Sequence, residues 1–293
     1  MNAAQIGFFI ALGVSALFLV IAWMRAARLG PESNRPTLGA MGVGALTSFL
    51  DTLGIGSFAP TTALFKLFHM VKDELIPGTL NVGLAASGVA EATIFVKSIE
   101  IDPALLAATI SSAAVGAWLG AGVVSRLPRR AIQIGMGVAL MVAAALFIAK
   151  NTELIPGGGD ALGLHGGVLV FAVAVSYLLG ALMMLGIGLY APCLIMVSLL
   201  GMNPLTAFPI MMGSCAFLMP IGGERFVRAG RYDRSAALAL AIGGIPGVLI
   251  AAFIVKSLPL VWLRWLVVVV VLYASVQMLR SAVRERASGT ARS

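Results

Sequence analysis

Two glycine-containing segments have the residue types in this sequence best suited to binding an anion. Residues 53–60 read LGIGSFAP and residues 185–192 read LGIGLYAP, and both interrupt long apolar stretches. Glycine permits backbone angles that other residues avoid, whereas proline suits the first turn of a helix. Each segment therefore predicts a break followed by a helix N-terminus, where free N–H groups and the helix dipole favour a negative charge.

Short polar side chains near the two breaks supply further hydrogen-bond donors. Ser57 and Thr61 follow the first break, and Tyr190 follows the second. Cys193 either contacts a sulfur-containing substrate or packs as a small apolar residue. The residues that we expect to form one substrate site are Gly54, Gly56, Ser57, Pro60, Thr61, Thr79, Asn81, Gly186, Gly188, Tyr190, Pro192, Cys193 and Ser214.

Two acidic residues lie within apolar stretches, where ionisable groups are functional candidates by default. Asp51 directly precedes the first break, and the corresponding position before the second break is Met183. Glu91 lies well inside a later apolar run. We expect these two side chains to bind a coupling proton or cation, with a simple hydrogen bond to a neighbouring helix as the alternative role of Asp51.

The composition indicates an all-α polytopic membrane protein. Of the 293 residues, 60% are hydrophobic and only 11% are charged, whereas about 25% of the residues in soluble domains are charged. Apolar runs long enough to cross a bilayer recur along the whole chain. We therefore expect one membrane domain over residues 1–293, with the lipid bilayer as partner. The net charge of +8 does not indicate nucleic-acid binding, because no basic face is left outside the apolar runs.

The chain contains an internal duplication. The two glycine motifs are 132 residues apart (54 to 186), and the same offset aligns Met70 with Met202 and Pro77 with Pro209. An offset of 131 then aligns three further pairs, namely Asp102 with Asp233, Gly116 with Gly247, and Pro128 with Pro259. This order predicts repeat 1 over residues 37–150, a linker at 151–165 and repeat 2 over 166–281. Each repeat is expected to be an interrupted hairpin followed by three transmembrane helices.

The N-terminal apolar run is expected to be an additional helix outside the repeats. Its basic residues, Arg25 and Arg28, follow the run, whereas a secretory signal peptide has them before it. A retained transmembrane helix over residues 5–24 is therefore predicted.

The positions of the arginines predict the topology. Arginine-rich segments lie at residues 25–35, 126–130, 225–234 and 280–286, and basic loops favour the cytoplasmic side. All four segments fall on one side only if each interrupted stretch enters the membrane, turns and returns. Equivalent loops of the two repeats then lie on opposite sides, as in inverted-topology repeats. The N-terminus is predicted to be periplasmic and the C-terminus cytoplasmic.

The duplicated Gly-x-Gly…Pro motifs, the two four-element halves and the chain length resemble the TauE/SafE (TSUP, sulfite exporter) family. The resemblance covers about residues 37–280. It implies a multi-pass protein of the bacterial inner membrane that transports sulfur-containing anions, including sulfite and organosulfonates. The sequence departs from the family pattern at Ser57 and Leu189, where the glycine run often continues.

We therefore expect a secondary transporter for a small anion, with the substrate held at mid-membrane between the two hairpins. A passive anion channel and a non-transporting assembly subunit are the alternatives. An enzyme is not expected, because the sequence has no His-Glu-x-x-His zinc motif and no Walker A motif. No catalytic residue, metal site or cofactor is predicted.

Overall fold

The structure is a computed structural model, and it describes residues 3–27, 35–154, 159–186, 188–254 and 260–290. Four parts of the sequence predictions lie outside these ranges: residues 28–34 of the first arginine-rich segment, residues 155–158 of the linker, Ile187 of the second motif, and Pro259 of the repeat alignment. Within the described ranges every regular element is a helix, and one isolated bridge joins Ala161 and Met202. The predicted all-α class is confirmed.

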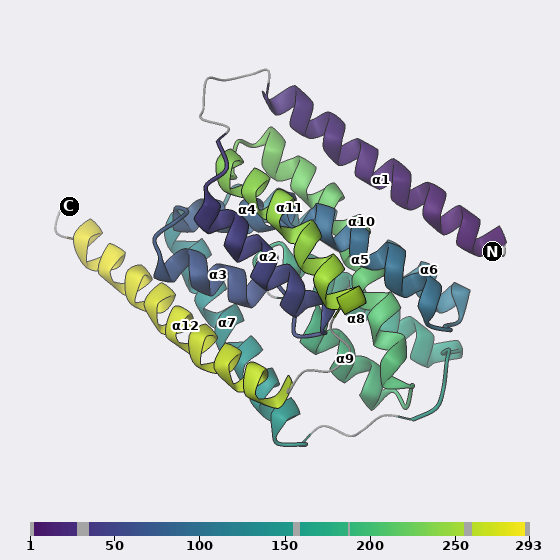
Figure 1. The fold of residues 1–293 in the computed structure, drawn as a ribbon. Coiled ribbons are helices and arrows are strands. Elements are labelled where there is room, and N and C mark those ends of the chain that lie inside the picture. The colour runs from purple at the N-terminus through teal and green to yellow at the C-terminus, as the bar shows by residue number, and fades with distance from the viewer. Residues whose placement is uncertain (1–2, 28–34, 155–158, 187, 255–259, 291–293) are drawn as a thin grey trace.

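Seven of the described helices or helical pairs are long and apolar enough to cross a membrane, which confirms a polytopic membrane protein. They are Ile6–Arg25, Asp73–Val96, Pro103–Val124, Arg129–Leu146, Gly166–Met183, Pro204–Arg228 and Arg234–Phe253. Helix α1 (Ala3–Ala27) packs along the outside of the other helices (Figure 1). There, the Ser15 hydroxyl donates to the Ala216 carbonyl, and Phe8 meets Phe217 with 5.6 Å between the ring centroids.

The remaining elements divide along the chain into two halves. The first half comprises α2 (Leu38–Thr52), α3 (Phe58–Leu67), η1 (Asp73–Leu75), α4 (Ile76–Gly83), α5 (Ala85–Ser98), α6 (Pro103–Val124) and α7 (Arg129–Asn151). The second half comprises α8 (Gly166–Met183), α9 (Tyr190–Leu199), η2 (Pro204–Thr206), α10 (Ala207–Arg228), α11 (Arg234–Leu249), η3 (Ile250–Ile254) and α12 (Leu260–Thr290).

One predicted span differs from the observed helices. The sequence predicts a single helix over residues 76–96, but the structure divides this segment into α4 and α5 at Leu84. Gly83 lies at the division, where a side chain would meet Ala237 and Leu240 of α11. The close approach of α11 therefore coincides with the division between α4 and α5.

Both interrupted segments turn back to the end of the molecule from which they start. At one end, which we call the basic end, the Ser235 hydroxyl donates to the Arg35 carbonyl beside the start of α2. The end of α3 lies at this end too. Its Lys66 forms an ion pair with Asp73, and Asp73 also lies near Arg129 of the arginine-rich segment 126–130.

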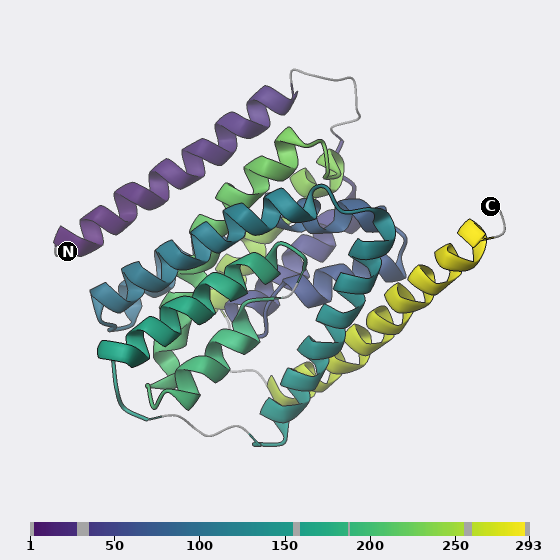
Figure 2. The same ribbon diagram turned by 180° about the vertical axis from the view of Figure 1, so that it is seen from behind.

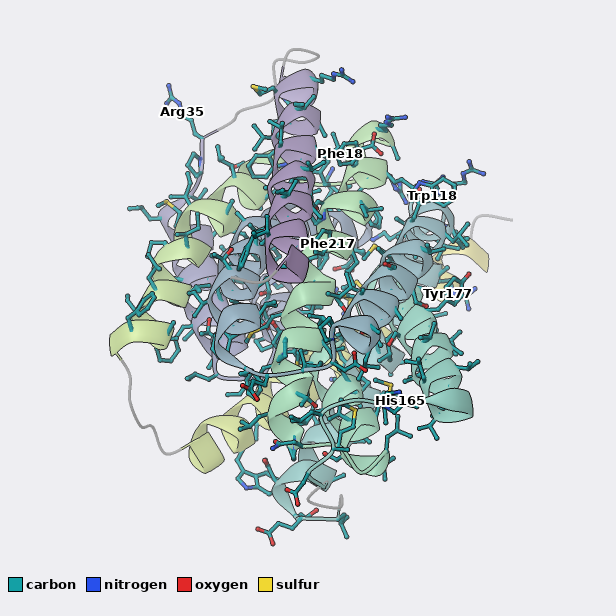
Figure 3. The ribbon with its side chains drawn as sticks, turned by 90° about the vertical axis from the view of Figure 1, so that its right-hand side faces the viewer. Phe18, Arg35, Trp118, His165, Tyr177 and Phe217 are labelled. Carbon is teal, nitrogen blue, oxygen red and sulfur yellow. The ribbon has the colours of Figure 1, made fainter. Side chains whose placement is uncertain are left out.

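The second hairpin starts and ends at the opposite end of the molecule. The Asp102 N–H donates to the Leu162 carbonyl just before α8. The Asn203 N–H donates to the Ala161 carbonyl just after α9. Figure 3 shows Arg35 and His165, which precede the two hairpins, toward opposite ends of the molecule.

Contacts between the two halves occur in matched pairs. Gly116 of α6 lies against the backbone of Tyr177 in α8, and Gly247 of α11 lies against the backbone of Ala45 in α2. These two contacts are related by the offsets of 131 (116 to 247) and 132 (45 to 177). Helices α7 and α12 correspond in the same way, and they lie side by side and run in opposite directions (Figures 1 and 2).

The glycine contacts predict a position-specific effect on stability. A Cβ on Gly44 would lie 2.8 Å from the Leu240 Cα of α11, whereas a Cβ on Gly42 meets no atom within 4 Å. Gly44→Ala is expected to lower the stability by about 1–3 kcal/mol through overpacking. The matched variant Gly42→Ala, in the same helix, meets no atom and is expected to leave it unchanged or raise it by up to about 1 kcal/mol, because alanine favours the helix over glycine. Thermal unfolding of the purified proteins in detergent measures both, and equal midpoints would contradict the observed packing of α2 on α11.

Candidate functional site

Three of the four motif glycines have a positive φ, the backbone conformation that a sharp break requires. Gly54 has a φ of 78°, Gly56 of 95° and Gly186 of 104°, values that residues with a side chain rarely adopt. At the first break the Gly54 N–H donates to the Asp51 carbonyl (2.8 Å), and at the second the Gly186 N–H donates to the Met183 carbonyl (2.9 Å). Each bond closes the last turn of the helix that enters the hairpin.

The two hairpin tips meet inside the protein. A Cβ on Gly56 would lie 3.6 Å from the Tyr190 Cβ, and one on Gly188 would lie 3.7 Å from the Phe58 Cβ. These two contacts are equivalent in the two repeats. Adding the offset of 132 residues to Gly56 and Phe58 gives Gly188 and Tyr190. The tips therefore touch in a two-fold related manner.

A small cavity lies where the tips meet. Its volume is about 20 Å³, and the residues that line it are Ile55, Gly56, Phe58, Ala59, Ala143, Leu146, Gly188, Tyr190, Ala191 and Pro192. The first turns of α3 and α9 both contribute to this lining, so two helix N-termini border one space. A cavity of this size has room for about one water molecule. The centre of the site is closed in this conformation.

Two buried carboxyl groups lie beside the tips. The Ser57 hydroxyl donates to Asp51 Oδ2 over 2.8 Å, within the first hairpin. The Tyr190 hydroxyl donates to Glu91 Oε2 over 2.9 Å, and Thr52 Oγ1 lies 3.0 Å from Glu91 Oε1. Glu91 of α5 therefore contacts the end of α2 and the start of α9, which belong to different hairpins.

The model of one protein family matches nearly the whole chain. The family is described as sulfite exporter TauE/SafE, and the match covers residues 2–147 and 168–293. The chain belongs to the TauE/SafE sulfite exporter family. No curated protein sequence and no solved structure matches it. Together with the apolar spans, the family identifies the chain as a multi-pass membrane protein of a transporter family.

Most of the predicted residues of this TauE/SafE protein gather at the tips. Gly56, Gly188, Tyr190 and Pro192 line the cavity. The others that lie in or next to the two breaks are Gly54, Ser57, Pro60, Thr61, Gly186 and Cys193. The Thr61 hydroxyl is 2.8 Å from the Ser57 carbonyl oxygen and 2.9 Å from Thr47 Oγ1. Cys193 is buried in α9 directly after Pro192 and is not among the residues that line the cavity.

The structure does not bring Thr79, Asn81 and Ser214 to the cavity between the tips. The Thr79 hydroxyl donates to the Leu75 carbonyl and accepts the Asp233 N–H at the basic end. The Asn81 amide donates to the Pro77 carbonyl within α4. Ser214 is buried in α10. Position in the sequence after Pro77 and beside Cys215 suggested these residues, but it does not determine which face of a helix they occupy.

Two polar residues of the site are absent from the predicted set. Thr52 follows Asp51 and contacts Glu91, and Thr47 contacts Thr61. Both are buried threonines on α2. Helical spacing could have indicated Thr47, since it lies four residues before Asp51 on the same face. The contact between Thr52 and Glu91 joins separate helices and has no local signal.

A larger groove lies elsewhere in the TauE/SafE protein. It has a volume of about 1350 Å³ and opens between α1, α6 and α10, where Phe8, Leu106 and Phe217 are among its lining residues. Its ionisable lining residues are Glu100, Asp102 and His165. None of the predicted site residues lines it. Neither hairpin break contributes to its lining, so size alone does not make this groove the substrate site.

An ion cluster fixes the basic end of the first hairpin. The Lys66 ammonium group lies 2.7 Å from Asp73 Oδ2 and 3.1 Å from Ser281 Oγ of α12. The Gln133 amide of α7 donates to the same Asp73 oxygen over 2.8 Å. Lys66 is thus engaged at the end of α3, away from the tips. The Asp73 carboxylate connects α3 with α7, and Lys66 connects both to α12.

Removing that carboxylate is expected to destabilise the protein. The side chains of Lys66 and Asp73 are 12% and 7% exposed, so Asp73→Ala leaves a nearly buried ammonium group without its partner. The expected loss is about 3–5 kcal/mol. The control is Glu100→Ala, because Glu100 is exposed and surface substitutions of this kind change the stability by about 0.5 kcal/mol or less. Thermal unfolding in detergent compares the two, and similar losses would contradict the role of the cluster.

Proposed function

We propose that this TauE/SafE protein is a secondary transporter that moves a small anion across the bacterial inner membrane. The substrate class is a sulfur oxyanion or an organosulfonate, with sulfite as the type compound. The substrate site is the junction of the two hairpin tips. The observation that carries the proposal is the single cavity bordered by the first turns of both α3 and α9.

The chemistry of the junction suits an anion. Each returning helix directs its N-terminal N–H groups and the positive end of its dipole toward the centre of the molecule. The prolines at 60 and 192 lie in the first turn of α3 and α9, where the missing N–H costs no helical hydrogen bond. The two helix N-termini approach the cavity from opposite directions, so their positive electrostatic potentials add there.

The matched contacts support an inverted repeat and an alternating-access cycle. The hairpins enter from opposite ends, α7 and α12 run in opposite directions, and each tip contact has an exchanged counterpart. Inverted repeats permit inward-open and outward-open arrangements in which the two halves exchange roles around a fixed site. The positive-inside rule assigns the basic end to the cytoplasm, which leaves the N-terminus periplasmic and the C-terminus cytoplasmic.

The closed junction favours a carrier over a permanently open channel. A cavity of about 20 Å³ is too small for sulfite, which has four heavy atoms. The tips must therefore move apart before an anion can enter. In a carrier this movement opens one side at a time.

Exchange in proteoliposomes tests the proposal. Purified protein is reconstituted with unlabelled anion inside, and uptake of the radiolabelled anion is followed for sulfite, thiosulfate and methanesulfonate. Transient accumulation of at least one label by counterflow is the expected result, with chloride and acetate as controls. Counterflow excludes a channel, because a channel does not couple the movements of inner and outer anions. Absence of flux for all three sulfur anions would contradict the proposal.

A further inference from the structure

Glu91 has hydrogen bonds to residues of both hairpins. Its side chain is fully buried in α5, within the span Asp73–Val96. One carboxyl oxygen contacts Thr52 at the end of α2, and the other accepts the Tyr190 hydroxyl proton at the start of α9. A single carboxyl group therefore contacts both hairpins.

The surroundings of Glu91 are acidic and contain no compensating cation among the described residues. The ionisable groups that face it are Asp51 on α2, Tyr190 on α9 and Cys215 on α10, with Cys193 next to Cys215. None of the described salt bridges involves Asp51 or Glu91. Two ionised carboxylates in this place would be costly in the membrane interior, and they would repel an anion at the tips.

The hydrogen-bond geometry indicates where a proton resides. Thr52 Oγ1 lies 2.8 Å from the Ser48 carbonyl oxygen and 3.0 Å from Glu91 Oε1. A hydroxyl group has one proton, which Thr52 must share between these two acceptors. A proton on Glu91 lets the acid donate to Thr52 while the Thr52 hydroxyl donates to Ser48. The neutral acid can thus satisfy both contacts of Thr52 and still accept from Tyr190 through Oε2.

We propose that Glu91 binds the coupling proton, so that one proton and one anion cross the membrane together. This inference rests on the transport function proposed above. A proton from the water on one side binds the Glu91 carboxylate and removes its negative charge, and the anion then binds between the tips. After the tips open to the other side, the anion and the proton leave to the water there, and the negative charge on Glu91 disfavours rebinding of the anion.

The second repeat has no counterpart of either buried carboxyl group. The position equivalent to Glu91 is a glycine at either offset, Gly222 or Gly223, and the position equivalent to Asp51 is Met183. The carboxyl groups therefore belong to the first repeat alone. A metal cation is a poorer occupant than a proton, because the oxygens of Thr52, Tyr190 and Glu91 are already at direct hydrogen-bond distances of 2.9–3.0 Å.

Accumulation and exchange, measured separately in proteoliposomes, test the proposal. The probe is whichever of sulfite, thiosulfate and methanesulfonate the wild-type protein exchanges fastest. An inward gradient of one pH unit is expected to drive about tenfold accumulation of a monovalent anion by 1:1 symport. A sodium gradient at equal pH is expected to drive none. A pH-sensitive dye trapped inside is expected to record one proton for each anion that enters.

Glu91→Gln mimics the neutral acid and cannot release a proton. It is expected to lose accumulation under the pH gradient while exchange continues within about tenfold of the wild-type rate, as for one altered hydrogen bond. The matched control is Glu100→Gln, which removes an exposed glutamate just after α5 and is expected to keep proton-driven accumulation.

The possible results separate the two proposals. Wild-type exchange without proton-driven accumulation, or with sodium-driven accumulation, overturns the role of Glu91 and leaves the transporter proposal standing. Proton-driven accumulation by Glu91→Gln, or a folded Glu91→Gln protein without exchange, also overturns it. No exchange by the wild-type protein overturns both proposals. If Glu91→Gln does not fold, the proton-to-anion ratio of the wild type decides, and a ratio of zero overturns the inference.

Discussion

Gly56→Val is expected to reduce anion exchange by about 100-fold, the effect of displacing a reacting or binding group by about 1 Å. Gly56 has a φ of 95°, which a β-branched residue adopts only with strain. The new Cβ would lie 3.6 Å from the Tyr190 Cβ, and the two methyl groups would extend beyond it into the cavity between the tips. Both the backbone of the break and the space for the anion are affected.

A substitution at a second glycine with a positive φ serves as the control for backbone strain outside the cavity. Gly201 has a φ of 72°, and a Cβ there meets no atom within 4 Å. Gly201→Val thus imposes comparable backbone strain at the end of the second hairpin without entering the junction. It is expected to exchange anions at a rate close to that of the wild type. Equal losses in the two variants, at equal amounts of folded protein in the vesicles, would show that the tip cavity has no special role.

A reversible crosslink between the tips is expected to stop transport completely. The Phe58 Cβ and a Cβ placed on Gly188 are 3.7 Å apart, within the range of about 3.5–4.5 Å that a disulfide requires. In the double variant Phe58→Cys/Gly188→Cys, oxidation should join the first hairpin to the second. If the tips separate in every cycle, transport falls to background on oxidation and recovers on reduction.

The single variants are the controls for the crosslink. Phe58→Cys and Gly188→Cys each retain the native Cys193 and Cys215, so they report any bond formed with those residues. Neither is expected to respond to oxidant. The extent of crosslinking is measured by mass spectrometry of the peptides. Undiminished exchange in a fully crosslinked double variant would contradict the movement of the tips, and with it the alternating-access cycle.

The fold was largely accessible from the sequence because its signals are local or periodic. Span length, the placement of arginines and the repeated LGIG motif indicated a polytopic all-α protein with two breaks. The division of one span at Leu84 was not predicted. It accompanies the packing of Gly83 against α11, and a contact between distant helices leaves no pattern in the segment itself.

Part of the candidate site could also be predicted from local sequence signals. Residues within the breaks, such as Gly56 and Tyr190, meet at the tips because the motif and the repeat place them there. Thr79 was expected nearby, but it bonds to Asp233 at the basic end. The contacts of Thr52 and Tyr190 with Glu91 join three helices, so only the assembled structure reveals that a single carboxyl group connects the two hairpins.

The position of a bound anion shows whether the junction of the hairpin tips is the substrate site. Selenite has the shape and charge of sulfite, and its selenium scatters anomalously. Crystals grown with selenite are expected to show an anomalous peak between the first turns of α3 and α9, within reach of Gly56 and Tyr190. A peak in the groove near His165 instead, with the tips unoccupied in a protein that exchanges selenite, would contradict the account.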